Sequence, residues 1–248
     1  MAPTLSVVIP VKDDALALRR CLAALADQTL APLEVVVVDN GSRDDSAAVA
    51  TDHGARVVTE PARGIPAAAS TGYDAALGDV VVRCDADTVA PPDWLERIEA
   101  QFAADPALDA LTGAGRFYDV GPLQAAVVGR LYLGAYYASM HAALGHPPLW
   151  GSNMAMRRSS WLRVTGTVHR TDPEVHDDAD LAFALGPRTR IVHDRTLVVA
   201  VSGRSLHGRA QLRRRFARAF HTLAVNWRRM PPWRRWAERS RAHRGSAT

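Results

Sequence analysis

The chain of 248 residues is 48% hydrophobic and 23% charged, with a formal net charge of +4. This length allows one large domain or two small ones, and the composition excludes a chain that is disordered throughout. No apolar run is long enough to predict a transmembrane helix, and the first residues lack the basic region of a signal peptide. Two cysteines form neither a disulfide framework nor a zinc knuckle, so we expect a reducing, cytoplasmic setting.

The charge is distributed unevenly along the chain. From Arg204 onward there are 13 arginines and one acidic residue, a net charge of +12, which leaves −8 for the preceding residues. An acidic body with a basic tail is typical of a protein whose partner carries the opposite charge.

Strand and helix patterns alternate through the first half of the chain. Strands are predicted at 5–9, 34–38, 56–59 and 80–82, and helices at 15–26, 44–53 and 65–77. Because strands buried on both faces read as unbroken apolar runs, the pattern predicts an α/β fold with a mostly parallel sheet. Such sheets bind ligands beyond the carboxyl ends of their strands, and polar segments follow three of these strands, at 10–14, 39–42 and 85–87.

The second half of the chain is less regular. Helices are predicted at 94–102, 123–144, 178–185 and 211–227, and strands at 150–156, 190–193 and 197–201. The last dozen residues are expected to be disordered. We therefore expect one domain over residues 1–205, followed by a basic amphipathic helix and tail over 206–248.

Asp85-Ala86-Asp87 directly follows a predicted buried strand. Two carboxylates on one turn suit a hard divalent cation, which takes one or two carboxylates together with the phosphates of a substrate. A solvated acidic turn is the alternative, since aspartate is common in turns. The position at a strand end favours the metal site.

Two other acidic segments and one polar segment are also candidates. Asp39 lies where a carboxylate would bind a base or ribose, although Asn40-Gly41 is equally a simple turn. The acids of 177–180 could cap a helix, or one of them, with its pKa raised by its neighbours, could act as a general base. Residues 150–153 either line an acceptor pocket or form a strand entering a turn.

Five motifs occur in one order along residues 4–205. They are Ser6-Val7-Val8-Ile9-Pro10, Val37-Val38-Asp39-Asn40-Gly41-Ser42-x-Asp44, Ala75-Ala76-Leu77-Gly78-Asp79 leading to Asp85-Ala86-Asp87, Gly151-Ser152-Asn153, and Asp177-Asp178-x-Asp180-Leu181. Together they resemble the inverting family 2 glycosyltransferases with the GT-A fold. The resemblance implies a Rossmann-like open sheet and an enzyme that uses a nucleoside-diphosphate sugar.

The resemblance also implies roles for individual residues. Base and ribose would contact Pro10, Asp13 and Asp39. Arg63 could pair with the diphosphate, although an exposed arginine at a helix start is the commoner alternative. Asp87 would bind Mn²⁺ or Mg²⁺, with Asp85 near ribose or metal and Ala86 between them in the donor site. His207, or failing that His193, would complete the metal shell, although a surface or satisfied histidine is the alternative for each. Asp178 would be the base that deprotonates the acceptor hydroxyl, beside an acceptor site formed by Trp150, Gly151, Ser152, Asn153 and Asp177.

Other classes of protein fit less well. The chain has no P-loop, no GxGxxG after its first strand and no GxSxG elbow. A nucleotidyltransferase on a similar scaffold would need a basic, glycine-rich loop where Lys12-Asp13-Asp14 stands. A non-catalytic nucleotide-binding scaffold protein remains the other alternative.

A stripe of apolar side chains runs along the basic helix expected near the C-terminus. It consists of Leu212, Phe216, Phe220, Leu223 and Trp227, with arginines on both sides and Trp233 and Trp236 beyond it. Such a stripe either packs on its own domain or lies on an anionic membrane surface. We therefore expect a lipid-linked or other hydroxyl acceptor at the cytoplasmic membrane face, and not a nucleic acid.

Overall fold

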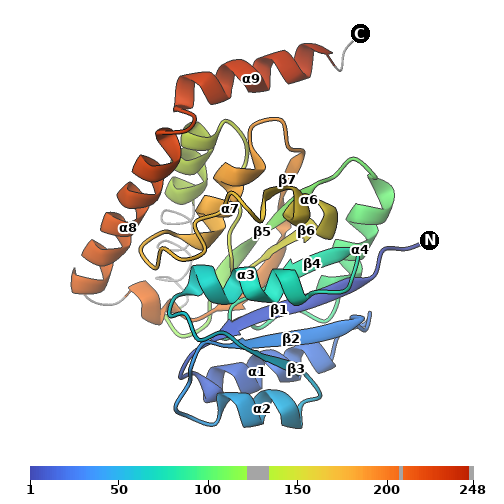
Figure 1. The fold of residues 1–248 in the computed structure, drawn as a ribbon. Coiled ribbons are helices and arrows are strands. Elements are labelled where there is room, and N and C mark those ends of the chain that lie inside the picture. Colours follow the sequence, from blue (N-terminus) through green and yellow to red (C-terminus); the bar gives the residue numbers. More distant parts are fainter. Residues whose placement is uncertain (122–133, 207–208, 246–248) are drawn as a thin grey trace.

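The computed structural model describes residues 1–121, 134–206 and 209–245, which form a seven-stranded sheet with helices on both faces (Figure 1). The strands are β1 (Leu5–Val11), β2 (Glu34–Asp39), β3 (Arg56–Thr59), β4 (Val80–Arg83), β5 (Ala110–Phe117), β6 (Met154–Arg157) and β7 (Ile191–Val201). The helices are α1 (Ala15–Ala26), α2 (Ser46–Asp52), α3 (Ile65–Ala75), α4 (Trp94–Ala104), α6 (Arg158–Val164), α7 (Asp177–Leu185), α8 (Arg209–Trp227) and α9 (Pro232–Gly245), with a short 3-10 helix η1 (Gly203–Leu206). Residues 134–144 are also helical.

The strand order is β3-β2-β1-β4-β6-β5-β7. Strand β1 pairs in parallel with β2 and β4, and β5 pairs in parallel with β7. Among these strands, β6 alone runs antiparallel to its neighbours β4 and β5. The α/β fold with a mostly parallel sheet, predicted from the sequence, is therefore confirmed. Because β6 runs in the opposite direction, the residues before it lie at the edge where the parallel strands end.

The central strands bury side chains on both faces of the sheet. Val7 and Ile9 of β1 belong to a core that includes α1 and α4, whereas Val8 belongs to a core on the other face with α3, α6 and α7. Helix α3 lies so close to the sheet that a Cβ on Gly72 would come within 2.3 Å of Val8. The two covered faces explain why the strands read as unbroken valine runs.

Strand β5 and helix α6 were not expected from the sequence. The pattern of β5 is weakened by Gly113 and Gly115, since glycine is unfavourable inside a strand. Both positions lack room for a side chain: a Cβ on Gly113 would lie 2.1 Å from Asn153, and one on Gly115 would lie 2.2 Å from Trp150. These glycines therefore reflect close packing against residues 150–153.

Three predicted elements differ in extent. The predicted strands 190–193 and 197–201 form one strand, β7, whose pairing with β5 is irregular between Thr112 and Ala114. The strand predicted over 150–156 begins only at Met154, because residues 150–153 form a turn and its approach. Of the helix predicted over 123–144, residues 134–144 are helical, and 122–133 lie outside the described residues.

The C-terminal segment folds back on the domain. The side chain of Asn226 in α8 donates to Asp180 of α7 at 2.8 Å. In α9, Arg235 is 3% exposed and its Nε donates to the Leu144 carbonyl at 2.7 Å. The expectation that the last dozen residues are disordered is wrong as far as Gly245, because such contacts hold α9 across one end of the molecule (Figure 1).

Candidate active site

Polar segments from four parts of the chain meet at the carboxyl edge of the sheet. They are the loop after β1, the end of β2, the turn after β4, and residues 150–153 before β6, with the N-terminus of α7 beside them. Side-chain hydrogen bonds join these segments to one another, as described below. The polar segments predicted at the strand ends are therefore brought together by the fold.

The loops after β1 and β2 hold each other in place. Ser42 Oγ accepts from the Asp13 amide at 3.1 Å, and Asp13 Oδ1 accepts from the Arg43 amide at 2.7 Å. Asp39 Oδ1 accepts from the Ser42 amide at 2.9 Å. Asp13 has a φ of +51°, a left-handed conformation that is uncommon for a residue other than glycine. Such strain is typical of loops that are shaped for a ligand.

Asn40, which the sequence marks only as a turn residue, organises the neighbouring loop. Its amide nitrogen donates to the carbonyls of Glu60 and Ala62 at 2.9 and 2.7 Å, and its amide oxygen accepts from the Gly64 amide at 2.9 Å. The side chain of Arg63 in this loop is exposed. Asn40 thus fixes the backbone on both sides of Arg63.

The Asp85-Ala86-Asp87 turn presents two carboxylates and buries the residue between them. Asp85 Oδ2 accepts from Ser152 Oγ at 2.5 Å, and Asp85 Oδ1 accepts from Arg83 at 3.0 Å. Ala86 is 6% exposed and its methyl group packs in the core. Burial, together with repulsion from Asp85, raises the pKa of Asp87 to about 7.

Arg204 of η1 neutralises the carboxylates on this side of the edge. Its guanidinium lies 3.3 Å from Asp87 and donates to both oxygens of Asp14. The sequence did not single out either Arg204 or Asp14, because they are far apart in the chain and carry no local motif. The positively charged Arg204 side chain therefore lies beside Asp87, the carboxylate expected to bind a metal ion.

Asp177 and Asp178 occupy different surroundings despite being neighbours at the start of α7. Asp177 Oδ2 accepts from Arg83 Nη1 at 2.5 Å, and burial raises the pKa of this carboxyl in spite of the arginine. Asp178 Oδ2 accepts from the Gly151 amide at 3.0 Å, and its Oδ1 accepts from the Ala179 amide at 2.7 Å. Two backbone donors therefore orient the Asp178 side chain. One of them belongs to Gly151, and the next residue, Ser152, donates to Asp85.

Residues 150–153 divide between the site and the core. Gly151 and Ser152 contact the acidic residues just described, whereas Asn153 is 0% exposed. The Asn153 side chain accepts from Trp94 Nε1 at 2.9 Å and donates to the carbonyls of Ala114 and Leu197. Since its amide is fully used and buried, the expected contact of Asn153 with an acceptor is revised to a structural role. Trp150 is partly buried and packs on Gly115.

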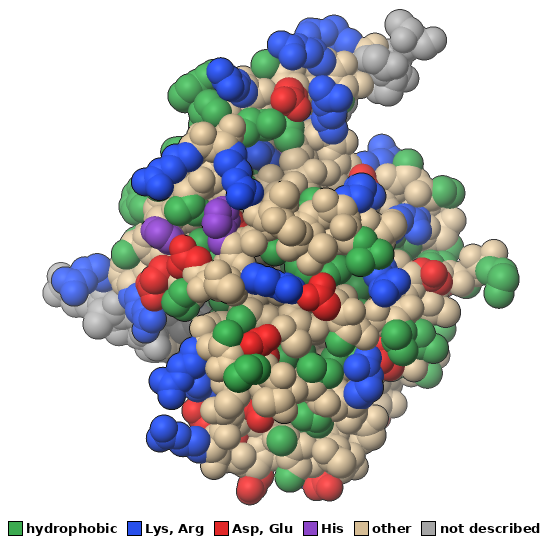
Figure 2. Space-filling view, in the orientation of Figure 1, with side chains coloured by type: hydrophobic (Ala, Val, Ile, Leu, Met, Phe, Trp, Pro, Cys, Tyr) green, Lys and Arg blue, Asp and Glu red, His purple; other side chains and the backbone are tan. Residues whose placement is uncertain are grey.

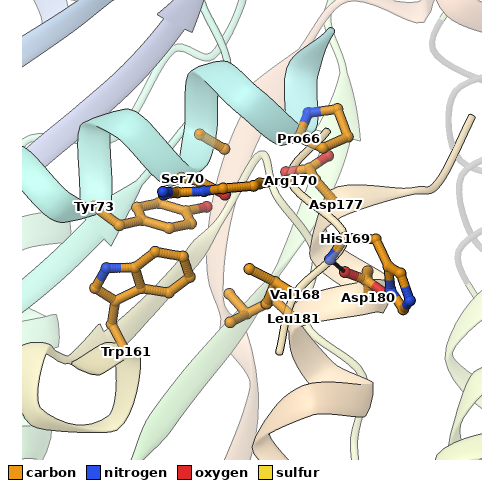
Figure 3. Close-up of a pocket in the computed structure, with 11 residues that line it drawn as sticks. Pro66, Ser70, Tyr73, Trp161, Val168, His169, Arg170, Asp177, Asp180 and Leu181 are labelled. Atoms are coloured by element: carbon orange, nitrogen blue, oxygen red, sulfur yellow. Dashed lines mark hydrogen bonds and ion pairs between the residues drawn. The ribbon is translucent and has the colours of Figure 1, made fainter. Parts of the chain in front are cut away.

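A small cavity lies behind Asp177 (Figure 3). Its volume is about 10 Å³, enough for one water molecule. Figure 3 shows Arg170 lying along Tyr73 on one side and His169 against Asp180 on the other, where His169 Nδ1 is 2.7 Å from Asp180 Oδ1. The cavity is too small for a sugar or a nucleotide, and its lining comes mainly from α3 and α7.

The described residues include no group of three or more histidine, cysteine or acidic side chains arranged to hold a metal ion. Asp85 and Asp87 fit a hard cation that takes its other ligands from phosphates, because they supply anionic oxygen and little else. His207 lies outside the described residues. His193 is in β7, which is separated from β4 by β6 and β5, and its ring stacks on Tyr137 with ring centroids 3.9 Å apart, which argues against a role in the metal shell.

Comparison with known proteins identifies the class. The model of the family "Glycosyl transferase family 2" matches residues 6–163. Glycosyltransferase AglE of Haloferax volcanii is 34% identical over 103 residues, 38% of this chain and 34% of its own length. Undecaprenyl-phosphate 4-deoxy-4-formamido-L-arabinose transferase of Sodalis glossinidius is 37% identical over 111 residues, 40% of this chain and 34% of its own.

Among solved structures, mannosyltransferase PcManGT from Pyrobaculum calidifontis, in complex with GDP-Man and Mn²⁺, has a TM-score of 0.70 at 23% identity. The match covers 97% of this chain and 69% of that chain. The chain therefore belongs to glycosyl transferase family 2, and its fold is of the GT-A type, as the five sequence motifs imply. The alignments span less than half the length of the curated relatives.

Within the part of the chain that the structure describes, no helix is both long and apolar enough to cross a bilayer.

Proposed function

We propose that this protein is an inverting glycosyltransferase that moves a sugar from a nucleoside-diphosphate sugar to an acceptor hydroxyl. The observation that carries this proposal is that one turn, formed by residues 150–153, is hydrogen-bonded both to the Asp-x-Asp motif and to the acidic start of α7. Asp85 is bonded to Ser152 and Asp178 to Gly151, so adjacent residues of one turn contact both the Asp-x-Asp motif and the acids of α7. A sugar donor held at the Asp-x-Asp motif would thus lie beside a base at Asp178.

The loops after β1 and β2 form the nucleotide side of the site in this proposal. Pro10, Asp13 and Asp39, at or just beyond the ends of these two paired strands, would contact base and ribose. Arg63 would pair with the diphosphate from the loop that Asn40 holds. Solved relatives with the same fold contain GDP-Man with Mn²⁺ or UDP with Mn²⁺, which supports this class of donor for our chain.

A divalent cation, Mn²⁺ or Mg²⁺, held by Asp87 and Asp85 would neutralise the charge that develops on the departing diphosphate. Asp178 accepts the proton of the acceptor hydroxyl as the hydroxyl oxygen bonds to the anomeric carbon. The bond from that carbon to the phosphate oxygen breaks, and its electron pair leaves with the nucleoside diphosphate. Attack from the opposite face inverts the anomeric configuration.

The acceptor side of the proposal is a lipid-linked or membrane-proximal hydroxyl at the cytoplasmic face of the membrane. The name of the Sodalis relative includes undecaprenyl phosphate, a lipid. Figure 2 shows arginines and apolar side chains interleaved over the region of α8 and α9. Phe216, Phe220 and Trp233 are 56%, 68% and 71% exposed, although other residues of these helices dock on the domain. Exposed aromatic rings among arginines suit an anionic lipid surface.

A transfer assay tests this function. Purified protein is incubated with UDP- and GDP-sugars, Mn²⁺ and a polyprenyl-diphosphate-linked sugar in vesicles, whose sugar hydroxyls are the acceptors, and the product's anomeric configuration is determined by NMR. We expect an inverted glycoside with at least one donor. A retained configuration would reject the mechanism, and transfer of a nucleotidyl group would favour the nucleotidyltransferase. Nucleotide binding without turnover of any donor would favour the scaffold protein.

A further inference from the structure

Arg83, the last residue of β4, is a buried cation that joins two acidic motifs. Its side chain is 3% exposed, with Nη1 2.5 Å from Asp177 and Nη2 3.0 Å from Asp85. Burial alone would lower the pKa of Arg83, but Asp177 and Asp85 raise it well above its ordinary range, so it stays charged. Removing one partner of such a buried pair is costly because the remaining charge is left without compensation.

The turn formed by residues 150–153 packs directly against the Arg83 guanidinium. A Cβ on Gly151 would lie 2.1 Å from Arg83 Nη1, so only glycine lets the turn lie against it. The amide of Gly151 donates to Asp178, and Ser152 donates to Asp85. Arg83 therefore contacts one acid from each motif and also supports the turn that contacts both motifs.

We propose that Arg83 is a positioning residue, which holds the base-bearing end of α7 in register with the Asp-x-Asp turn. This inference rests on the proposed function and adds a residue that no sequence motif marks. Arg83 itself would contact neither the sugar nor the acceptor. Its planar guanidinium places two donors at fixed angles, a geometry that the single ammonium of lysine does not reproduce.

The chain contains a matched control in the neighbouring strand. Arg157 of β6 is also an arginine at a strand end, but within the described part of the chain its side chain donates to the carbonyls of Phe102, Asp105 and Leu108 and to no carboxylate. It pairs with Val80, at the end of β4 opposite to Arg83. Arg157→Lys therefore removes a comparable guanidinium that does not contact Asp85 or Asp177.

The first experiment compares amide hydrogen exchange in full-length wild type, Arg83→Lys and Arg157→Lys, and needs no turnover. We expect Arg83→Lys to accelerate exchange in peptides covering 150–153 and 176–180 by about tenfold or more, since a local opening that is 1.4 kcal/mol easier is ten times more populated. Arg157→Lys should leave these peptides unchanged. Unchanged exchange there in Arg83→Lys would overturn the inference.

The second experiment measures transfer by the same variants. For Arg83→Lys we expect kcat to fall by about tenfold to a hundredfold, because a misplaced base loses orientation, while KM for the donor stays within about threefold. Gly151→Ala, which pushes on the same guanidinium, should reproduce this separation of kcat from KM. Arg157→Lys should lower the melting temperature without lowering kcat.

A double variant separates positioning from general loss of structure. If Arg83 acts through Asp177, then Arg83→Lys/Asp177→Asn should lose no more kcat than the worse single variant. Multiplied losses, or an equal fall in donor affinity, would contradict the inference. Should wild type transfer no sugar at all, the proposed function fails, whereas the exchange comparison still decides whether Arg83 couples the two segments.

Discussion

At the scale of single residues, the structure separates side chains that look equivalent in the sequence. Asp177 and Asp178 are adjacent acids, yet Asp177 is bonded to the buried Arg83 and Asp178 to two backbone amides. The charge of Asp177 is thus compensated within the protein, while Asp178 faces the turn of residues 150–153. This difference favours Asp178 over Asp177 as the proposed base.

Replacing Asp178 by asparagine removes the proton acceptor and keeps the shape of the side chain. We expect kcat to fall by about 10²- to 10⁴-fold, the usual contribution of a general base. Calorimetric binding of a nucleoside diphosphate with Mn²⁺ should be retained. Asp172→Asn, in the loop before α7, serves as the control and should keep wild-type kcat. Wild-type turnover by Asp178→Asn would reject the assignment.

Arg204 provides a second prediction at this scale. Its guanidinium lies against Asp87 and Asp14, so a metal ion must compete with it for Asp87. Arg204→Ala should bind Mn²⁺ without nucleotide about fivefold more tightly, which corresponds to a partly exposed ion pair worth about 1 kcal/mol. Electron paramagnetic resonance of free Mn²⁺ measures this affinity. Arg43→Ala, an exposed arginine of a nearby loop, should leave it unchanged, and weaker binding by Arg204→Ala would contradict the competition.

At the scale of elements, α8 and α9 combine a docked face with an exposed one. Leu223 and Trp227 of the predicted apolar stripe pack on the core beside α7, whereas Phe216 and Phe220 are exposed. Docking on the domain, one of the two roles expected from the sequence, therefore applies to part of the stripe. The exposed part remains available for the proposed lipid surface.

Vesicle binding tests that surface. We expect the full chain to bind vesicles containing anionic lipid, and binding to weaken with salt, since each arginine near such a surface adds about 1 kcal/mol. Phe220→Ala/Trp233→Ala should reduce the bound fraction. Leu162→Ala, which removes an exposed apolar side chain from α6, is the control. Equal recovery of all variants in the supernatant would count against membrane association.

The docking of α9 predicts a pH effect on stability. His146 is buried, Nδ1 faces the Pro147 carbonyl at 2.9 Å, and Nε2 faces Arg235 at 3.3 Å. Burial, together with Arg235 and Arg239, lowers the pKa of His146 from 6.5 to about 3. His146 therefore binds a proton below pH 6.5 in the unfolded chain but not in the folded chain. The free energy of unfolding falls as the pH decreases from 6.5 toward 3.

Between pH 7 and pH 5 this group alone should reduce the free energy of unfolding by about 2 kcal/mol. Urea denaturation of wild type and His146→Gln at both pH values measures the effect. The variant should lose about 2 kcal/mol less than wild type over this interval. Parallel losses in the two proteins would show that His146 is accessible to protons in the folded state.

At the scale of the whole molecule, the net charge of +4 combines an acidic body with a basic C-terminal segment. The acidic body includes the carboxylates of the site. The basic segment divides again, because Arg235 and Arg239 donate to backbone carbonyls of the domain. Only the remaining exposed arginines can meet an anionic partner.

The sequence predicted the sheet and the loops of the site because both follow local patterns. A valine run marks a buried strand, and the polar residues after it must lie at the carboxyl edge. Contacts between distant segments leave no such pattern. The hydrogen bonds of Arg83 to Asp177 and of Arg204 to Asp14 join residues far apart in the chain, and the need for glycine at 113 comes from its contact with the distant Asn153.

We propose that Asp85 and Asp87 form, with a metal ion, the site for a nucleoside diphosphate. Calorimetric titration of wild type and Asp87→Asn with UDP and GDP, with and without Mn²⁺, tests this site. We expect at least one of the two nucleotides to bind wild type, Mn²⁺ to tighten this binding by about tenfold or more, and Asp87→Asn to abolish the effect of Mn²⁺. Binding that is equally tight without metal, or unaffected by Asp87→Asn, would contradict the assignment of the site.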